Sequence, residues 1–508
     1  MFVAKVAPGN LNTKRLDSDF YRPEYVKIDK VLSQLKCVKL GTVGKFFTGP
    51  FGSKLPSNLY LDKGVPLFRV GNVGQFEVLV DNFAYLAPTV HDELKVSEVL
   101  PGDLLIVKAS VGEKICKVPE WLPKANITQH IIGIRPNGSK DTDFVSAFLF
   151  SYYGVGQLQR YSLGSIIQYL GITDAKGVNL YSPAPLVQKY IGDKVRQAEQ
   201  LRAWAKRLRA SVDGKLNSLN LPINEPPQLL NRVSAQTMED RLDPRPYRSH
   251  YLHLVNEIEK LPHDSINSLV GLASGCPVSS KDFLENAGIP LVRIRNIGFD
   301  DFIGLDTGVS KDAYQDASKY QAKEKMVVVG MDGIFRSQFF VADELPMLVN
   351  QRVAMLVPQK IRGELLTHWL NRPEGQMQLN QWAVKTTVEH TSLSDIGRVL
   401  IPRLDERLEN KLADDLLNAR LAYRYAKFLT QTAKTLVEAL IEGQITEQQL
   451  LQAQQALDDG DDGLDKAILG KLSSEGYAIE GATPLFSDLD ELYRLLESAA
   501  QAETEDGE

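Results

Sequence analysis

Arginine and asparagine side chains occur at matching places in two distant parts of this 508-residue chain. Arg69 and Asn72 follow one short apolar segment, and Arg293, Arg295 and Asn296 follow a similar one. Arginine can donate two hydrogen bonds to O6 and N7 of guanine, and asparagine can pair with N6 and N7 of adenine. For each residue alone, an ion pair or a turn inside the protein is an equally ordinary role. As a repeated set they favour contact with DNA bases, although a shared structural role would repeat too.

Polar loops beside other apolar segments supply further candidates for DNA contact. The loop Gly49–Lys54 combines flexible backbone N–H groups with the ammonium of Lys54, which suits a phosphate, and a plain turn before a strand is the alternative. The remaining candidates have side chains that fit phosphates or base edges, with simple solvation as the equal alternative: Lys108, Ser110, Lys114, Arg336, Gln338 and Lys385.

These candidates lie within a sequence that occurs twice. Residues 15–25 (RLDSDFYRPEY) and 241–251 (RLDPRPYRSHY) are identical at six of eleven positions. The similarity continues in order through three short segments rich in β-branched residues, which pair 64–73 with 288–297, 104–107 with 326–329, and 129–136 with 351–358. Such segments, bounded by Gly, Pro, Asn and Asp, are typical of strands. The repeat therefore predicts one α/β domain present in two copies.

Each copy ends in a long segment with the apolar spacing of a helix. Apolar or small residues recur every three or four positions from about 185 to 219 and again from about 404 to 442. This alternation is typical of a coiled-coil seam, and thirty-five helical residues extend roughly 50 Å. Two copies of a domain followed by a long helix can fold with pseudo-two-fold symmetry. We expect the two helices to pack antiparallel and to separate the two domains.

The predicted fold is α+β, with two α/β domains alternating with two long helices packed as an antiparallel coiled coil. The predicted parts are a first α/β domain (1–184), a first long spacer helix (185–220), a linker (221–240), a second α/β domain (241–403), a second long spacer helix (404–442) and an acidic helical C-terminal extension (443–508).

Charge is unevenly distributed along the chain. The net charge is −6, yet residues 443–508 hold sixteen acidic and three basic residues and so carry −13, which leaves +7 on residues 1–442. A basic body favours a polyanionic partner, and the acidic extension is either a solvated tail or a separate interaction segment. Capping-box patterns at Thr446 and Ser487 predict short helices in it. We hypothesise that the apolar face of Leu489, Leu492, Leu495 and Leu496 docks to a partner subunit.

Several classes of protein are disfavoured. The three cysteines are far apart and form no C-x-x-C pair, so neither a metal site nor a disulfide is expected. No apolar run is long enough for a bilayer and no export signal is evident, which predicts a cytoplasmic protein without membrane contact. The chain also has no phosphate-binding loop, H-E-x-x-H or G-x-S-x-G motif, so we expect no catalytic residues.

The order of these motifs resembles the specificity (S) subunits of type I restriction–modification systems over nearly the whole chain. The resemblance is carried by Gly49-Pro50-Phe51-Gly52-Ser53-Lys54-Leu55, by the segment 64–72, by Pro101–Ile106, by Asn126–Gln129 and by Leu436–Thr446 at the close of the second helix. It implies that the two α/β domains are target-recognition domains, each contacting one half of a bipartite sequence in double-stranded DNA.

The resemblance also implies partners that perform the chemistry. A non-catalytic S subunit binds two methyltransferase (modification) subunits, which methylate adenine with S-adenosylmethionine, and restriction subunits, which use ATP and Mg²⁺ to translocate and cut DNA. No cofactor is expected in this chain. The alternative is a protein-only scaffold or binding module with duplicated sheet domains. The second copy has Ala273–Val278 in place of the GPFGS loop, which leaves the geometry of that loop open but not the type of domain.

Overall fold

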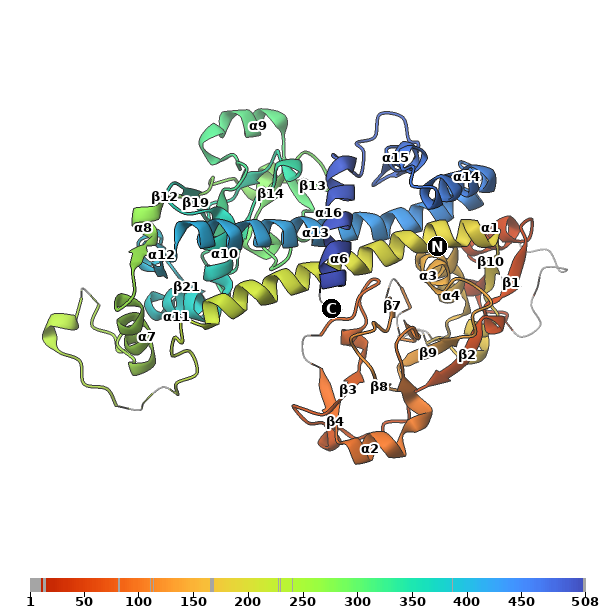
Figure 1. Ribbon diagram of the computed structural model, residues 1–508, viewed down its shortest axis with the longest axis horizontal. Coiled ribbons are helices and arrows are strands. Elements are labelled where there is room, and N and C mark those ends of the chain that lie inside the picture. The colour runs from red at the N-terminus through yellow and green to blue at the C-terminus, as the bar shows by residue number, and fades with distance from the viewer. Residues whose placement is uncertain are drawn as a thin grey trace. The chain divides into compact units, whose positions relative to one another are not determined.

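A computed structural model of the chain describes residues 11, 15–80, 83–109, 111–112, 114–164, 169–226, 228, 230–239, 241–385 and 387–505. It divides into two compact units. Unit 1 comprises residues 1–201 together with 425–508, and unit 2 comprises residues 202–424. Each unit contains a set of small sheets and part of each of two long helices (Figure 1). The fold is therefore mixed helix and sheet.

The long helices are α6 (Pro185–Asn217) and α13 (Glu406–Ile441), drawn in yellow and blue in Figure 1. Their apolar residues recur at helical spacing and are fully buried, as at Ala419, Ala422 and Ala426 of α13. Beyond the end of α13, Gly443 adopts a positive φ of 74°, the left-handed conformation that commonly ends helices.

In each unit, the start of one long helix is close to the end of the other. In unit 2, residues from the end of α6 and the start of α13 share a buried apolar cluster that includes Val212, Leu216, Leu412 and Leu416. In unit 1, the backbone N–H of Ala184, just before α6, donates to Glu447, shortly after α13. The end of α6 therefore packs against the start of α13 in unit 2.

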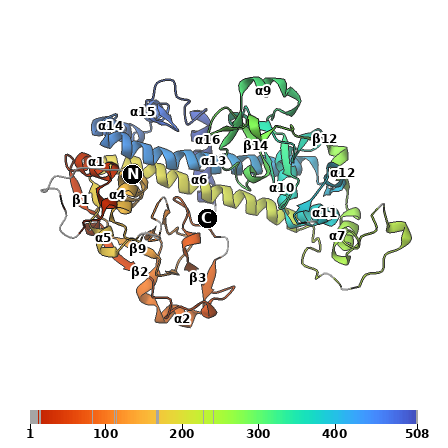
Figure 2. The ribbon, with the colours of Figure 1, turned by 180° about the vertical axis from the view of Figure 1, so that it is seen from behind.

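Unit 1 contains two four-stranded sheets (Figure 2). The first has the order β2 (Gly44–Thr48), β9 (Ile131–Pro136), β6 (Leu104–Val107), β7 (Ile115–Lys117). The second has the order β4 (Ala84–Leu86), β3 (Val65–Phe68), β8 (Ala125–Ile127), β5 (Glu98–Val99), and β3 and β8 are parallel.

Unit 2 contains the same arrangement, except at one strand of the second sheet. Its first sheet has the order β12 (Val270–Ser274), β19 (Val353–Pro358), β16 (Val327–Gly330), β17 (Ser337–Phe339). Its second sheet has the order β13 (Leu284–Glu285), β15 (Thr307–Val309), β14 (Ile289–Val292), β18 (Leu348–Val349), with β14 and β18 parallel. The parallel pair β14/β18 corresponds to β3/β8.

Smaller elements complete each unit. Unit 1 adds the strand pair β1 (Cys37–Lys39) and β10 (Asn179–Tyr181) and the helices α1 (Pro23–Leu32), α3 (Thr142–Phe150) and α4 (Tyr152–Tyr161). Unit 2 adds β11 (His263–Ser265) and β22 (Leu400–Pro402) and the helices α7 (Ser249–Glu259), α10 (Gly363–Asn371) and α11 (Pro373–Trp382). In α10, Trp369 is 1% exposed within a buried apolar cluster of unit 2, and its indole N–H donates to the carbonyl of Leu400.

The most similar stretch of the repeat makes the same contacts in both units. The Tyr21 hydroxyl donates to the carbonyl of Arg15 at 2.6 Å, and the Tyr247 hydroxyl donates to the carbonyl of Arg241 at 2.7 Å. The two arginines in turn donate from Nε to an aspartate two residues later, each at 2.7 Å. The sequence repeat is therefore a repeat of local structure.

The C-terminal extension is part of unit 1 and contains α14 (Glu447–Asp458), α15 (Gly463–Leu469) and α16 (Leu489–Glu505). Thr446 caps α14 as its sequence predicts, whereas Asp488, not Ser487, caps the first turn of α16. Two side chains of the apolar face of α16 are buried, with Leu492 at 1% and Leu495 at 0% exposure. The hypothesis that this face docks to a partner is therefore wrong for those two side chains.

Candidate nucleic-acid interface

Loops gather at the carboxyl ends of the parallel strands in both units. In unit 1 the backbone N–H of Thr128 donates to the carbonyl of Phe68 at 3.1 Å, and in unit 2 that of Asn350 donates to Val292 at 3.0 Å. We define the first loop cluster as residues 49–54, 69–72, 108–109, 128–130, 163–164 and 169. The second loop cluster is residues 275–278, 293–296, 331–336, 350–352, 384–385 and 387–390.

In each cluster a glycine, Gly49 or Gly275, lets its loop pass directly against the backbone at the end of a neighbouring strand. A Cβ atom at Gly49 would lie 1.9 Å from the carbonyl oxygen of Ile127, and one at Gly275 would lie 2.3 Å from that of Asn350. Both loops therefore pass close to the backbone at a strand end although their sequences differ, which is the point that the sequence left open. Beyond Gly49, Phe51 is 78% exposed and Lys54 is exposed in a turn.

Backbone hydrogen bonds identify equivalent residues in the two clusters. The N–H of Lys108 donates to the carbonyl of His130 at 2.8 Å, and the N–H of Met331 donates to that of Arg352 at 3.1 Å. Residues 104–107 therefore correspond to 327–330, one residue later than the sequence repeat predicts. At the same hairpins, the carbonyls of Lys114 and Arg336 accept from the last residues of the preceding strands. The next segments also match. The backbone of Tyr169 forms β-bridges with Leu163 and Ala109, and the backbone of His390 pairs in the same way with Val384 and Asp332. The clusters thus share one backbone framework and differ in side chains.

Lys108 is buried instead of lying in an exposed loop. Its side chain is held inward by hydrogen bonds from Nζ to the Thr48 hydroxyl (3.1 Å) and to the Gln129 carbonyl (3.2 Å), and Nζ lies 5.2 Å from the centre of the Tyr169 ring. Burial lowers the pKa of Lys108. No carboxylate pairs with it among the residues that the structure describes. A cation so placed is stabilised by an anion brought from outside.

Arg352 of the second cluster faces outward with its guanidinium held by a carboxylate. Its Nε and Nη2 donate to the two carboxylate oxygens of Asp332, each at 2.7 Å, while its side chain stays 52% exposed. The Nδ1 atom of His390 lies 2.5 Å from Asp332. At the equivalent position of the first cluster, His130 contacts the Gln129 amide at 3.2 Å.

Three predicted contact residues have their amide groups occupied within their own unit. Asn72 is 2% exposed, accepts from the backbone N–H of Arg69 and donates to the carbonyl of Leu79. Asn296 does the same at 1% exposure, accepting from Arg293. Gln338 is 1% exposed on β17 and donates to the carbonyls of Gly298 and Phe299. These amides position loops, and we leave them out of the proposed contact surface.

The arginines predicted to contact DNA lie in the clusters, with part of each side chain accessible. Arg293 donates to the Thr307 hydroxyl at 2.6 Å, and burial together with the neighbouring Arg295 lowers its pKa. Arg295 is 57% exposed and pairs with Asp306. The guanidinium of Arg336 lies 4.9 Å from the ring centre of Phe299. Arg69 is half-buried just before the short helix η5 (Val70–Asn72).

Of the three remaining predicted residues, the structure describes Lys114 fully, Lys385 in its backbone alone, and Ser110 not at all. Lys114 is exposed at the first hairpin. Lys385 has its backbone in strand β20 (Val384–Lys385), and its side chain lies outside the described part of the chain. Ser110 also lies outside the described residues.

Sequence reasoning missed His130, Tyr169, Asp332, Arg352 and His390. Two of them carried a signal, because His130 and Arg352 are aligned inside the repeat 129–136/351–358 and differ where their neighbours match. The other three are brought to the cluster by the fold alone. His130 and Arg352 are thus different side chains at one position of a shared backbone framework.

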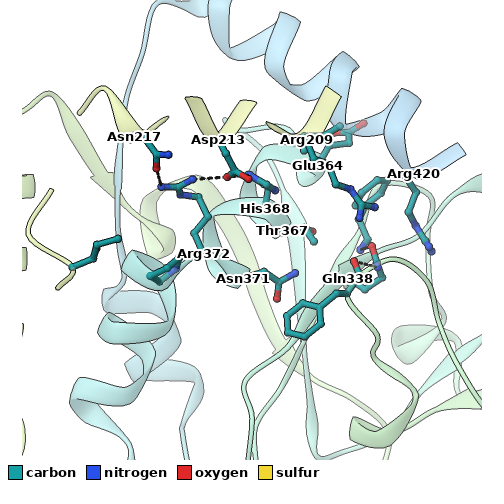
Figure 3. A pocket seen from close by; sticks show the side chains of 15 residues that line it. Arg209, Asp213, Asn217, Gln338, Glu364, Thr367, His368, Asn371, Arg372 and Arg420 are labelled. Carbon is teal, nitrogen blue, oxygen red and sulfur yellow. Dashed lines mark hydrogen bonds and ion pairs between the residues drawn. The ribbon is translucent and has the colours of Figure 1, made fainter. Parts of the chain in front are cut away.

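A pocket of about 420 Å³ in unit 2 lies among α6, α13, α10 and β17 (Figure 3). Arg372 donates to Asp213 at 2.5 Å and to Asn217 at 2.8 Å, and His368 lies 2.9 Å from the same aspartate. Burial would raise the pKa of Asp213, but these hydrogen bonds outweigh it and the pKa is lowered. The ion pairs across this pocket fix α10 to α6, and so help to orient the sheets of unit 2 on the long helices.

The described residues contain neither a cluster of metal-ligating side chains nor a membrane-spanning helix. No three His, Cys, Asp or Glu side chains gather where they could hold a metal ion. No helix in that part of the chain combines the length and apolar character needed to cross a membrane.

Comparison with known proteins gives matches in structure only. No family model and no curated protein matches the sequence. Among solved structures, the S subunit of a type I restriction–modification system from M. genitalium is 13% identical, with 80% of this chain and 94% of that chain covered and a TM-score of 0.43. The HsdS subunit from Thermoanaerobacter tengcongensis is 16% identical, with 84% and 96% covered and a TM-score of 0.26. A chain from a structure of type I restriction–modification complex assembly is 16% identical, with 85% and 97% covered and a TM-score of 0.26.

Proposed function

We propose that this chain is the DNA sequence-specificity subunit of a type I restriction–modification complex. It recognises a bipartite target, with one half-site contacted by the loop cluster of each unit. The observation that carries the proposal is the pair of loop clusters, which share a backbone framework and differ in side chains at equivalent positions, as at His130 and Arg352. A framework used twice with different side chains suits two half-sites of different sequence.

The charges at the clusters support DNA as the ligand. Both clusters present cations near exposed loop tips, and Lys108 is buried without a carboxylate among the described residues. The body of the chain carries +7 when the acidic extension is set aside. Phosphate contacts made by such cations would position the duplex, while arginine and other side chains at the tips contact base edges.

The proposed domain organisation follows the repeat. The target-recognition domains are residues 1–184 and 241–403, joined through a linker at 221–240. The long helices pack as an antiparallel coiled coil with pseudo-two-fold symmetry and set the distance between the half-sites. Support comes from the buried apolar cluster between α6 and α13 in unit 2 and from the regular burial along α13.

Catalysis is assigned to partner subunits. The chain has none of the catalytic motifs considered, and its resemblance to S subunits implies two methyltransferase subunits and, for cleavage, restriction subunits. S-adenosylmethionine, ATP and Mg²⁺ would be bound by those partners. This chain contributes sequence recognition and an attachment surface.

The test is genome-wide mapping of methylated adenine in cells with and without the gene for this chain. A two-part sequence methylated only when the chain is present is the expected result. The purified complex with its methyltransferase should also bind that duplex in preference to others, with affinity that falls steeply as salt rises. An unchanged methylation map, together with salt-insensitive binding and no preference among duplexes, would favour the protein-only scaffold.

A further inference from the structure

Arg352 lies at the tip of the second loop cluster, immediately before β19. Its carbonyl accepts from Met331, which fixes the backbone, and its guanidinium is held at the surface. Exposed apolar side chains belong to the same cluster, with Ile334 at 62% and Val388 at 46% exposure. The backbone N–H of Gly333 donates to the carbonyl of Glu389 at 2.8 Å, which ties the two loops carrying these side chains together.

Asp332 occupies one edge of the Arg352 guanidinium. It accepts from Nε and from one hydrogen of Nη2, so the second Nη2 hydrogen and both Nη1 hydrogens remain. Nδ1 of His390 contacts the carboxylate of Asp332, and because an ionised carboxylate can only accept, Nδ1 donates its hydrogen there. A donating Nδ1 cannot also accept from Nη2 of Arg352, which lies 3.3 Å away. The terminal edge of the guanidinium therefore keeps two adjacent N–H donors.

We propose that Arg352 recognises a guanine in the half-site contacted by unit 2, donating from Nη1 and Nη2 to O6 and N7. Asp332 is a positioning residue that fixes the plane of the guanidinium, and His390 fixes Asp332. The inference rests on the proposed function and names one base determinant within it. Two parallel acceptors at this spacing are offered in the major groove by guanine.

The same geometry discriminates against the other bases. Adenine presents an amino group where guanine has O6, so an N–H donor of Arg352 would face another donor there. Asp332 also offsets the charge of Arg352, which weakens its attraction to a phosphate relative to an unpaired arginine. A fixed and partly neutralised guanidinium is thus better suited to neutral acceptors on a base edge.

The first cluster supplies a matched control. His130 is equivalent to Arg352, but it has a single imidazole in place of the paired donors, and the residue equivalent to Asp332 is Ala109. Removal of the His130 side chain should leave the guanine preference in the half-site of unit 2 unchanged.

The experiment measures binding of the complex with its methyltransferase to duplexes in which each position of both half-sites is varied in turn. For Arg352→Lys, which keeps the charge and loses the paired donors, we expect about 5- to 150-fold loss of preference for guanine at one position and none elsewhere. Asp332→Asn should reduce the same preference at the same position. His130→Ala should leave that position unaffected. Thermal unfolding of each variant confirms that it is folded.

Two results would overturn the inference. One is an equal loss of affinity of Arg352→Ala for all bases, with a salt dependence reduced by about one unit, which indicates a phosphate contact. The other is unaltered base preference in both Arg352 variants. Failure of the proposed function is distinguishable, because the wild-type complex itself would then prefer no bipartite duplex.

Discussion

Lys194 and Asp465 form an ion pair at 2.7 Å in which the two side chains are 1% and 2% exposed. Lys194 belongs to α6 and Asp465 to the C-terminal extension, 271 residues further along the chain. Asp465 also accepts from the hydroxyls of Tyr190 and Tyr493. These three donors all lie in unit 1, so the acidic extension is bound to the first long helix and is not a free tail.

Removing one member of this pair should destabilise unit 1 strongly. Asp465→Ala leaves the ammonium of Lys194 buried without its partner, and we expect the free energy of unfolding to fall by about 3–5 kcal/mol. Chemical denaturation followed through tryptophan fluorescence measures it. The matched control is Lys189→Ala. Lys189 lies on α6 like Lys194, but its ion pair with Asp458 is exposed, so its removal should change stability little. Equal effects of the two variants would contradict the assignment.

The same pair predicts a dependence of stability on acid. Burial would raise the pKa of Asp465, but Lys194 and the two tyrosines outweigh it and the folded-state pKa is lowered. The contribution of Asp465 is therefore present above the usual aspartate pKa near 3.9 and is lost as pH falls through the lower folded-state value. Unfolding of wild type and Asp465→Asn between pH 7 and pH 2 should show the difference in stability between them narrowing in acid.

Lys108→Met should raise the stability of unit 1 and weaken DNA binding. The equivalent residue of unit 2 is Met331, so the framework accepts this side chain, and the substitution removes a buried charge that has no carboxylate partner among the described residues. We expect greater resistance to denaturant and weaker DNA binding, with the slope of log affinity against log salt reduced by about one.

The sign of the pH effect at Lys108 follows from its lowered pKa. Between the lowered folded-state pKa and the usual lysine pKa of 10.5, the unfolded chain binds the proton and the folded chain does not, so stability rises with pH there. Denaturation of wild type between pH 8 and 10.5 should show this contribution, and Lys108→Met should lack it. A variant of lower stability that keeps full DNA affinity would refute both expectations.

Arg69→Ala and Arg293→Ala should each affect one half-site. The two arginines occupy equivalent positions before η5 and before η9 (Ile294–Asn296), in different units. If each contacts a base through two hydrogen bonds, its removal costs about 1–3 kcal/mol and relaxes specificity at its own half-site. Binding to duplexes mutated in one half at a time gives the measurement. An equal loss at both halves from either substitution would argue against separate recognition by the two units.

Inserting one helical turn into either long helix should change the spacer between half-sites. Four residues lengthen a helix by about 6 Å, roughly the rise of two base pairs. Methylation mapping with the lengthened chain should return the same half-sites at a different separation. Retention of the original spacer would mean that the helices do not set it.

The sequence was informative wherever structure is determined locally. Apolar residues every three or four positions mark α6 and α13 closely, and the repeat anticipated equivalent strands in the two units. Residue type alone could not tell that the amide groups of Asn72 and Asn296 turn inward, because the same side chain suits a base edge and a loop carbonyl equally well.

Contacts between segments far apart in the chain could not be predicted from the sequence. Asp332, Arg352 and His390 come together only when two hairpins pack at one strand end. The apolar face of α16 was recognised, but the burial of Leu492 and Leu495 within this chain could not be read from the pattern.

The division of the chain into one continuous and one discontinuous unit has a consequence for the order of events during synthesis. Unit 2 is one stretch from Arg202 to Arg424, whereas unit 1 needs residues from both ends of the chain. At about 5–20 residues per second, the ribosome takes roughly 10–45 s to make the intervening stretch. During that interval Lys194 has no Asp465 to bind, and the first-made portion of the polypeptide must stay incomplete until the last-made portion emerges.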